Sequence, residues 1–353
     1  NPNGVSGRID IPGETRSYSF TLTDETLALF DSLTDNSGFT WTLTGPEGAV
    51  VEARRFDQSD SRDFQSNPTL RLVPGAYTLT VDGANDATGF FNFRLTNLAN
   101  ATPLAMGARV DGELVPSNAS AAYNFAANAG EKLIFDAIEV RNEIWWRLVD
   151  PFGNDVVGSS GFSDLDNLEL PFTGTYTLLV EGRVSQNSSA SYAFRVLPLT
   201  IQTAALTIGD RIDGTISVPG ESDAYSFTLA QSTKLVFDSL ADLQPANWTL
   251  SGPGGTIVTA REFRSSDGID FGGNPVLDLA AGDWTLTVDG AGDFTGDYAF
   301  RLLDLAQAPE MVAGGSYNGT FSQLGRETDM YRFNATKGMR FGFDSTQSVS
   351  TNN

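Results

Sequence analysis

One nine-residue segment is repeated three times in this chain, and it restricts the fold more than any other feature. It reads Gly-Ala-Tyr-Thr-Leu-Thr-Val-Asp-Gly at residues 75–83, and related segments occupy residues 174–182 and 282–290. Large apolar side chains alternate with mostly polar ones, and glycines stand at both ends. Alternation with a period of two is typical of a β-strand with one buried face. Tyr77 and Val81 are therefore predicted to point into a core.

Other residues recur in register with this strand. Tyrosines at positions 18, 123, 225 and 331 are each followed by a Phe-Asp pair, and the first three pairs are followed by a tryptophan strand that ends in a Pro-x-Gly turn. The repeat is slightly over 100 residues long, which is the size of a domain and not of a solenoid repeat. Each complete repeat contains about seven short alternating strands and no helical period, which predicts an antiparallel β-sandwich.

The chain is thus predicted to be all-β, a tandem array of antiparallel β-sandwich modules of about 100 residues, jelly-roll or immunoglobulin-like in type. Modules 1 and 3 share a long loop, at residues 53–70 and 260–277, which module 2 lacks. We call modules 1 and 3 A-type, and modules 2 and 4 B-type. The expected bounds are 1–102 for module 1, 103–204 for module 2, 205–309 for module 3 and 310–353 for an incomplete module 4.

The segments that connect the modules are short and partly apolar. Residues 98–106, 199–208 and 305–312 contain no Gly/Ser runs, in contrast to flexible linkers. Neighbouring modules are therefore expected to touch one another and to form a semi-rigid array.

Composition excludes several classes of function. The 353 residues carry 44 acidic and 22 basic side chains, a net charge of −22, and such a surface repels nucleic acids and anionic membranes. The absence of cysteine and histidine excludes disulfides, thiolate and imidazole catalysis and ordinary zinc sites. No apolar run reaches the length of a membrane helix, so direct membrane insertion is not expected. A chain without thiols is compatible with a secreted or cell-surface location.

The order of these motifs resembles that of the bacterial pre-peptidase C-terminal domain, a small secreted β-sandwich. The resemblance covers the three complete modules and depends on the Gly-x-Tyr-x-Leu-x-Val strand and the Asp/Gly-Pro-x-Gly turn. Such domains accompany exported enzymes or are repeated along large surface proteins, where they bind or space and do not catalyse. No peptidase accompanies the modules here. The resemblance implies a stalk, adhesin or surface-filament component, with neighbouring modules, other copies or cell-surface glycans as partners.

Carboxylates are the remaining candidates for catalysis. A glycosidase needs two of them facing each other across a cleft, one with a raised pKa. Aspartates recur in the Phe-Asp pairs, but each stands at the end of a predicted strand, where capping of a turn is the better explanation. We therefore expect no enzymatic activity. These aspartates are Asp31, Asp136, Asp238 and Asp344.

Calcium is the sharper hypothesis, because this ion takes several oxygen ligands. Acidic and amide side chains recur in two places in the A-type modules, the long loop and the last hairpin. Solvated turns are the alternative, since aspartate and glycine are common there. The candidate ligands are Asp60, Asp63 and Asn67 with their counterparts Asp267, Asp270 and Asn274 in the loops, and Asp82, Asp86, Asp289 and Asp293 in the hairpins.

Trp145 is the candidate for stacking on a sugar ring. Its neighbour Trp146 aligns with the core tryptophans Trp41 and Trp248, so strand alternation turns Trp145 to the opposite face. An outward tryptophan is equally suited to cover a sheet edge or a module junction. These ligand candidates leave a second function open, that of calcium- or carbohydrate-binding accessory modules of a secreted hydrolase.

Module 4 contains the tyrosine and the Phe-Asp pair of its type, at Tyr331 and Phe343, but no tryptophan strand follows. Three strands cannot bury several large aromatic side chains. We expect the natural chain to extend beyond both ends of this sequence and to complete module 4.

Overall fold

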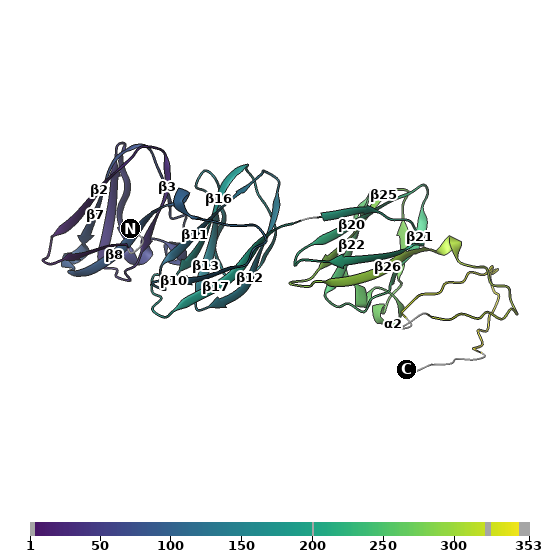
Figure 1. Ribbon diagram of the computed structural model, residues 1–353. Helices are drawn as coiled ribbons and strands as arrows, with labels where there is room; N and C mark the ends of the chain where they lie inside the picture. Colours follow the sequence, from purple (N-terminus) through teal and green to yellow (C-terminus); the bar gives the residue numbers. More distant parts are fainter. Residues whose placement is uncertain (1–3, 200, 322–325, 346–353) are drawn as a thin grey trace. The chain divides into compact units, whose positions relative to one another are not determined.

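The computed structural model describes residues 4–199, 201–321 and 326–345. It is all-β, and modules 1, 2 and 3 are each built from two facing sheets (Figure 1). The chain divides into two compact units, Asn1–Leu199 with modules 1 and 2, and Thr200–Asn353 with module 3 and the residues after it. Each unit is described by itself.

Module 1 contains eight strands among its described residues. They are β1 (Val5–Ile9), β2 (Thr15–Leu22), β3 (Thr26–Ser32), β4 (Phe39–Gly45), β5 (Gly48–Arg55), β6 (Thr69–Leu72), β7 (Gly75–Gly83) and β8 (Gly89–Asn97). One sheet has the order β1-β8-β3-β6 and the other the order β2-β7-β4-β5, with antiparallel neighbours throughout. This arrangement of eight strands in two sheets is that of a jelly roll.

Modules 2 and 3 repeat this topology and add one strand each. Module 2 contains β9 (Thr102–Pro103), β10 (Val110–Leu114), β11 (Ser120–Ala127), β12 (Lys132–Arg141), β13 (Ile144–Val149), β14 (Asp155–Gly161), β15 (Leu165–Glu169), β16 (Gly174–Gly182) and β17 (Ala190–Pro198). Module 3 contains β18 (Ile201–Ala205), β19 (Arg211–Ile216), β20 (Ser222–Leu229), β21 (Thr233–Ser239), β22 (Ala246–Gly252), β23 (Gly255–Glu262), β24 (Val276–Leu279), β25 (Gly282–Gly290) and β26 (Gly296–Asp304).

The added strands come from the connecting segments. β9 pairs in parallel with β11, and β18 pairs in parallel with β20. Both connections therefore form an edge strand of the following module. Since β18 begins at Ile201, module 3 starts a few residues before the expected boundary at residue 205.

Short helical turns lie between the strands. The long A-type loop folds into η1 (Phe56–Gln58) and α1 (Ser61–Phe64) in module 1, and into η4 (Phe263–Ser265) and α2 (Gly268–Phe271) in module 3. The other turns are η2 (Ala84–Asp86), η3 (Leu98–Asn100) and η5 (Leu305–Gln307).

The recurrent aromatic residues form the cores, as predicted. Trp41 stacks on Phe30 with ring centroids 3.9 Å apart, and Trp248 stacks on Phe237 at 4.1 Å. On β7 the side chains of Tyr77, Leu79 and Val81 are buried, and those between them are more exposed. The period-two pattern therefore identifies the inner face of this strand.

The glycine that opens each repeated strand has a conformational and a packing reason. Gly75 has a φ of +149°, which non-glycine residues rarely adopt. A Cβ at Gly75 would also lie 2.7 Å from Cγ of Pro46 in the Pro-x-Gly turn. Gly174 and Gly282 are in the same situation against Pro151 and Pro253. The two motifs recur together because the turn packs on the start of the strand.

The described residues from 310 to 345 form no strand ladder. Their one backbone pairing is a parallel bridge between Glu310 and Arg332. Large side chains remain exposed, among them Tyr331 at 40% and Phe343 at 75%. Residues 322–325 and 346–353 of the expected module 4 lie outside the described part.

No helix in the described ranges combines the length and the apolarity needed to span a membrane.

Candidate functional site

One sheet of module 2 has an apolar outer face where the matching sheet of module 1 is polar. Leu179 takes the place of Thr80, and Val149 takes the place of Thr44. All residues of β16 from Tyr176 to Gly182 are buried. Because consecutive side chains on a strand point to opposite faces, both faces of β16 are covered. This makes the outer face of module 2 the first candidate for a functional surface.

Module 1 covers this face. Leu29 on β3 and Leu98 on η3 form a buried cluster with Val149 and Leu179 of module 2. The side chains of Leu27 and Ala122 pack at the rim of this cluster. The two modules of the first unit therefore share an apolar junction that belongs to neither sandwich core.

A buried ion pair stands beside the junction cluster. Arg94 on β8 donates from Nε to Oδ2 of Asp31 at 2.7 Å. The other oxygen of Asp31 accepts from the backbone N–H of Ser120 at 3.1 Å, and Nη2 of Arg94 donates to the carbonyl of Ser120 at 3.0 Å. Both backbone groups of one module 2 residue are thus bound by a charge pair of module 1. Asp31 is therefore a docking residue, and the expectation that it caps a turn is wrong.

The long A-type loop contacts module 2 at two further points. Oδ1 of Asp63 accepts from Nε of Arg183 at 3.2 Å, and its Oδ2 accepts from the backbone N–H of Val184 at 3.1 Å. The Nδ2 of Asn67 donates to the carbonyl of Gly153 at 2.7 Å. Two of the three side chains of this loop that were candidates for calcium, Asp63 and Asn67, thus bind the neighbouring module.

Further buried charges lie under the loop. Oδ2 of Asp60 accepts from the backbone N–H of Ser32 at 2.9 Å. Burial raises the pKa of Asp60 well above its usual value, and the neighbouring Asp31 carboxylate raises it further. On module 2, burial raises the pKa of Glu181 to about 7, although Arg147 opposes the shift with its Nε 3.5 Å from Oε1 of Glu181. The junction therefore contains carboxyl groups that retain protons at unusually high pH.

In module 3 the matching loop makes no such contacts with a second module among the described residues of its own unit. Oδ2 of Asp267 accepts from the backbone N–H of Ser239 at 2.9 Å, as Asp60 does from Ser32. Burial raises the pKa of Asp267 to about 6. Asp270 and Asn274, however, are exposed. Their carboxylate and amide groups face solvent where Asp63 and Asn67 bind module 2.

The hairpin candidates for calcium are exposed in both A-type modules. Asp82 and Asp289 lie near the ends of β7 and β25, Asp86 is the last residue of η2, and Asp293 stands in the matching turn of module 3. Ser222 donates from Oγ to Oδ1 of Asp289 at 3.4 Å. Calcium at the loops and at the hairpins remains a prediction.

Trp145 lies at the module junction. Its core neighbour Trp146 is 3% exposed, whereas Trp145 is half-buried on the opposite face, as alternation predicts. The guanidinium of Arg62 on α1 lies 4.2 Å from the centroid of the Trp145 ring. The arginine of module 1 occupies one face of the indole. Of the two expected positions, a sheet edge and a module junction, Trp145 therefore lies at the junction. A depression of about 450 Å³ adjoins it, lined by Arg62, Gln65, Ser66, Trp145, Arg147, Asp155, Gly158 and Ser159.

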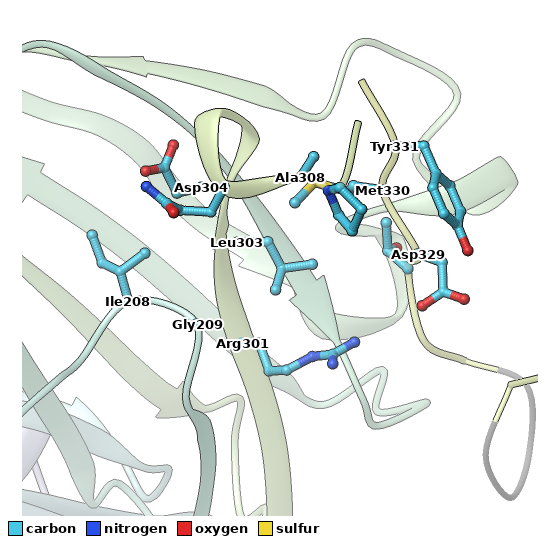
Figure 2. A pocket seen from close by; sticks show the side chains of 12 residues that line it. Ile208, Gly209, Arg301, Leu303, Asp304, Ala308, Asp329, Met330 and Tyr331 are labelled. Atoms are coloured by element: carbon cyan, nitrogen blue, oxygen red, sulfur yellow. The ribbon is translucent and has the colours of Figure 1, made fainter. Parts of the chain in front are cut away.

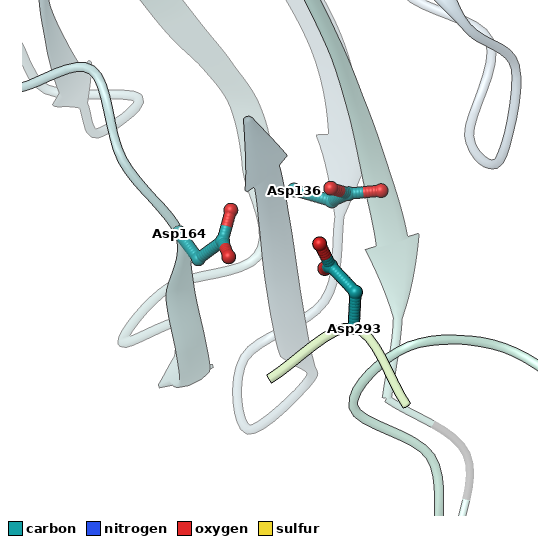
Figure 3. A group of neighbouring side chains, drawn as sticks. All are labelled: Asp136, Asp164 and Asp293. Atoms are coloured by element: carbon teal, nitrogen blue, oxygen red, sulfur yellow. The ribbon is translucent and has the colours of Figure 1, made fainter. Parts of the chain in front are cut away.

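The aspartate of the Phe-Asp pair in module 2 is also an ion-pair residue. Arg195 donates from Nε to Oδ2 of the buried Asp136 at 2.8 Å. Asp164 comes from a neighbouring turn, and its Oδ1 accepts from the backbone N–H of Ala137 at 2.8 Å (Figure 3). Asp293, drawn in the same figure, belongs to the second unit and is described above.

Sequence reasoning missed the docking face of module 2, although a signal for it was present. The sixth residue of the repeated strand is a threonine in modules 1 and 3, Thr80 and Thr287, but it is Leu179 in module 2. Likewise the tryptophan strand continues as Thr-Leu-Thr after Trp41 but as Arg-Leu-Val after Trp146. Loss of the polar half of an alternating pattern indicates a strand that is buried on both faces.

Comparison with known proteins leaves the chain without an assigned family. No family model matches it, and no curated protein matches it. Among solved structures, a periplasmic inhibitor of g-type lysozyme from Aeromonas hydrophila, PliG, is 14% identical over 28% of this chain and 95% of its own, with a TM-score of 0.24. The CUB1-EGF-CUB2 domain of human MASP-1/3 is 8% identical over 54% and 99%, with a TM-score of 0.18. These scores are too low to carry an argument.

Proposed function

We propose that this chain is a segment of a bacterial secreted or cell-surface protein made of non-catalytic tandem modules, acting as a stalk, adhesin or surface-filament component. The observation that supports this most is the junction of modules 1 and 2. Independent ligand-binding domains joined by a linker need no such surface between them. A protein that must keep its modules in fixed register along a chain does need one.

The state of the candidate catalytic groups agrees with this proposal. Asp31, Asp136 and Asp238 are all buried, and each is paired with an arginine of the same module. Buried ion pairs of this kind hold backbone in place, and removing one partner strongly destabilises the fold. A catalytic carboxylate must instead reach a substrate in a cleft. The net charge of −22 also suits a solvated extracellular surface.

Antibodies raised against the chain test the location. Intact cells of the source organism are expected to be stained, and protease treatment of those cells is expected to remove the signal. Staining that requires permeabilised cells would contradict the proposal. Small-angle scattering of the full chain tests the stalk: an extended particle is expected, and modules clustered around one centre would contradict it.

The second candidate function, accessory modules that bind carbohydrate for a secreted hydrolase, is supported by the depression beside Trp145. Its indole N–H is buried and has no hydrogen-bond partner among the described residues. Polar side chains surround it, as in sites that orient a small polar ligand. A glycan array is expected to show binding that Trp145→Ala abolishes and Trp284→Ala, in the core of module 3, does not selectively abolish. An array without signal would exclude this function for the glycans it displays.

A further inference from the structure

Module 3 repeats the docking side of module 1. Arg301 donates from Nε to Oδ2 of the buried Asp238 at 2.7 Å, as Arg94 does to Asp31. The free oxygen of Asp31 accepts from Ser120, the third residue before Tyr123. The free oxygen of Asp238 accepts from the N–H of Thr328 at 2.9 Å, and Thr328 is the third residue before Tyr331. The second unit thus contains the same ion pair and backbone contact that lie at the junction of modules 1 and 2.

The pairing that starts module 2 is also repeated. In module 2, Pro103 is the partner of Asn124, and Leu104 donates from its N–H to the carbonyl of Asn124 at 2.8 Å. After module 3, Glu310 bridges to Arg332 in parallel, and the N–H of Met311 donates to the carbonyl of Arg332 at 2.7 Å. Residues 310–311 and 328–332 therefore take, beside module 3, the positions that residues 103–104 and 120–124 take beside module 1.

The other contacts of the first junction have no counterpart among the residues that the structure describes in the second unit. A cavity of about 340 Å³ remains between the outer side of β26, at Arg301 and Leu303, and the segment from Thr328 to Tyr331 (Figure 2). The figure shows the side chains of both segments around this hollow. The loop residues Asp270 and Asn274 of module 3 are exposed.

We propose that this surface of module 3, formed by the outer faces of β21 and β26 and by the loop 267–274, is the docking site of a B-type module whose described beginning is residues 310–321 and 326–333. It is the same kind of interface that joins modules 1 and 2, and the segment that begins the partner is already bound to it. Module 2 is not the occupant, because its matching face is held by module 1.

The partner's chemistry follows from the first unit. Its outer sheet face carries apolar side chains at the positions of Val149 and Leu179, to cover Val236 and Leu305 of module 3. An arginine followed by a backbone N–H, like Arg183 and its successor, meets Asp270. A carbonyl in a Pro-x-Gly turn meets Asn274. One difference is that Lys234 of module 3, paired with Asp278, stands where module 1 has Leu27. The apolar part of this interface is therefore smaller than that of the first unit.

A labelling experiment uses the absence of cysteine from the chain. In the variant Asn274→Cys the new thiol is the one site for a maleimide. The rate of maleimide labelling is compared between the 353-residue chain and a fusion in which residues 310–353 are replaced by a second copy of residues 103–204. Docking is expected to slow labelling at least tenfold in the fusion. Asp283→Cys, on the other sheet of module 3, is the control and is expected to react equally in both.

Two further variants decide the result. Arg183→Ala in the appended copy alone is expected to restore fast labelling. If the fusion does not fold, a second fusion retains residues 310–344 and continues with residues 137–204, since Asp344 corresponds to Asp136. Unchanged labelling of Asn274→Cys in a folded fusion would overturn the proposal. Protection in the natural chain that rises with protein concentration would also overturn it, because a second copy would then be the occupant.

Discussion

Replacing Leu179 by alanine tests whether module 2 stabilises module 1. Leu179 is fully buried, and its side chain belongs to the junction cluster, whereas its neighbour Leu178 belongs to the core of module 2. Burial of a leucine contributes about 1.5–3 kcal/mol, and truncation to alanine in a packed site costs about 2–5 kcal/mol. The modules can separate while remaining joined by the chain, so the loss cannot exceed the free energy of docking. We expect a loss of about 2–3 kcal/mol.

Amide hydrogen exchange followed by mass spectrometry measures this loss of docking free energy in module 1. While module 2 holds it, module 1 must undock in order to unfold, so its opening free energy includes the docking term. Leu179→Ala is therefore expected to accelerate exchange in β7 of module 1 by about 30- to 150-fold, from 1.4 kcal/mol per tenfold change. The substitution lies in a different module from the amides that report it.

Leu178→Ala is the matched control, the same change on the same strand but on the opposite face. It is expected to accelerate exchange within module 2 and to leave β7 unchanged. Thr80→Ala removes the side chain at the position of module 1 that corresponds to Leu179, and a surface change of this kind is expected to alter stability by less than about 0.5 kcal/mol. An unchanged exchange rate in β7 of the Leu179→Ala variant would show that the junction does not couple the stabilities of the two modules.

Three other predictions concern charges. Asp31→Ala is expected to lower the free energy of unfolding of the first unit in urea by about 3–5 kcal/mol, because Arg94 loses its buried counter-charge. Adding Arg94→Leu should recover most of this loss. An unchanged urea midpoint for the single variant would contradict the docking role. Burial raises the pKa of Glu181 to about 7 from 4.5, so the folded state binds the proton more tightly and the first unit loses stability as pH rises from about 4.5 to about 7, by roughly 3 kcal/mol. Glu181→Gln should remove this slope, and equal slopes for both proteins would exclude Glu181 as its source. If the A-type loops bind calcium, a chelator should lower the melting temperature and Asp60→Ala or Asp267→Ala should remove that sensitivity; identical melting curves with calcium and with chelator would end the hypothesis.

The sandwich cores could be predicted because their signal is local and repeated. Large aromatic residues at fixed spacing, such as Trp41 and Phe30, have one stable place in a two-sheet module. The glycines at the ends of the repeated strand could also be predicted. Gly75, for example, adopts a positive φ and leaves no room for a Cβ beside Pro46. The jelly-roll order was one of two expected arrangements, because strand length and spacing do not state which strands are neighbours in a sheet.

The junction could not be predicted from the motifs, because it depends on residues that interrupt them. The acidic and amide residues of the long loop have the composition of a calcium site, and aspartate serves equally well as an acceptor for Arg183 and a backbone N–H. Only the three-dimensional arrangement distinguishes an ion from an arginine as the partner of Asp63. Asp31 was misjudged because it lies inside β3, directly opposite Arg94 of β8, and not in the turn that follows the strand.

The two module types differ in ways that make their docking directional. An A-type module offers the long loop, and threonines such as Thr80 and Thr287 on the outer face of one sheet. A B-type module offers Leu179 on that face and lacks the long loop. Pairing of two A-type modules through these faces would bury polar threonine side chains where the first unit buries leucine and valine, and pairing of two B-type modules would lack the loop contacts. In the first unit these differences favour docking of an A-type module on a B-type one.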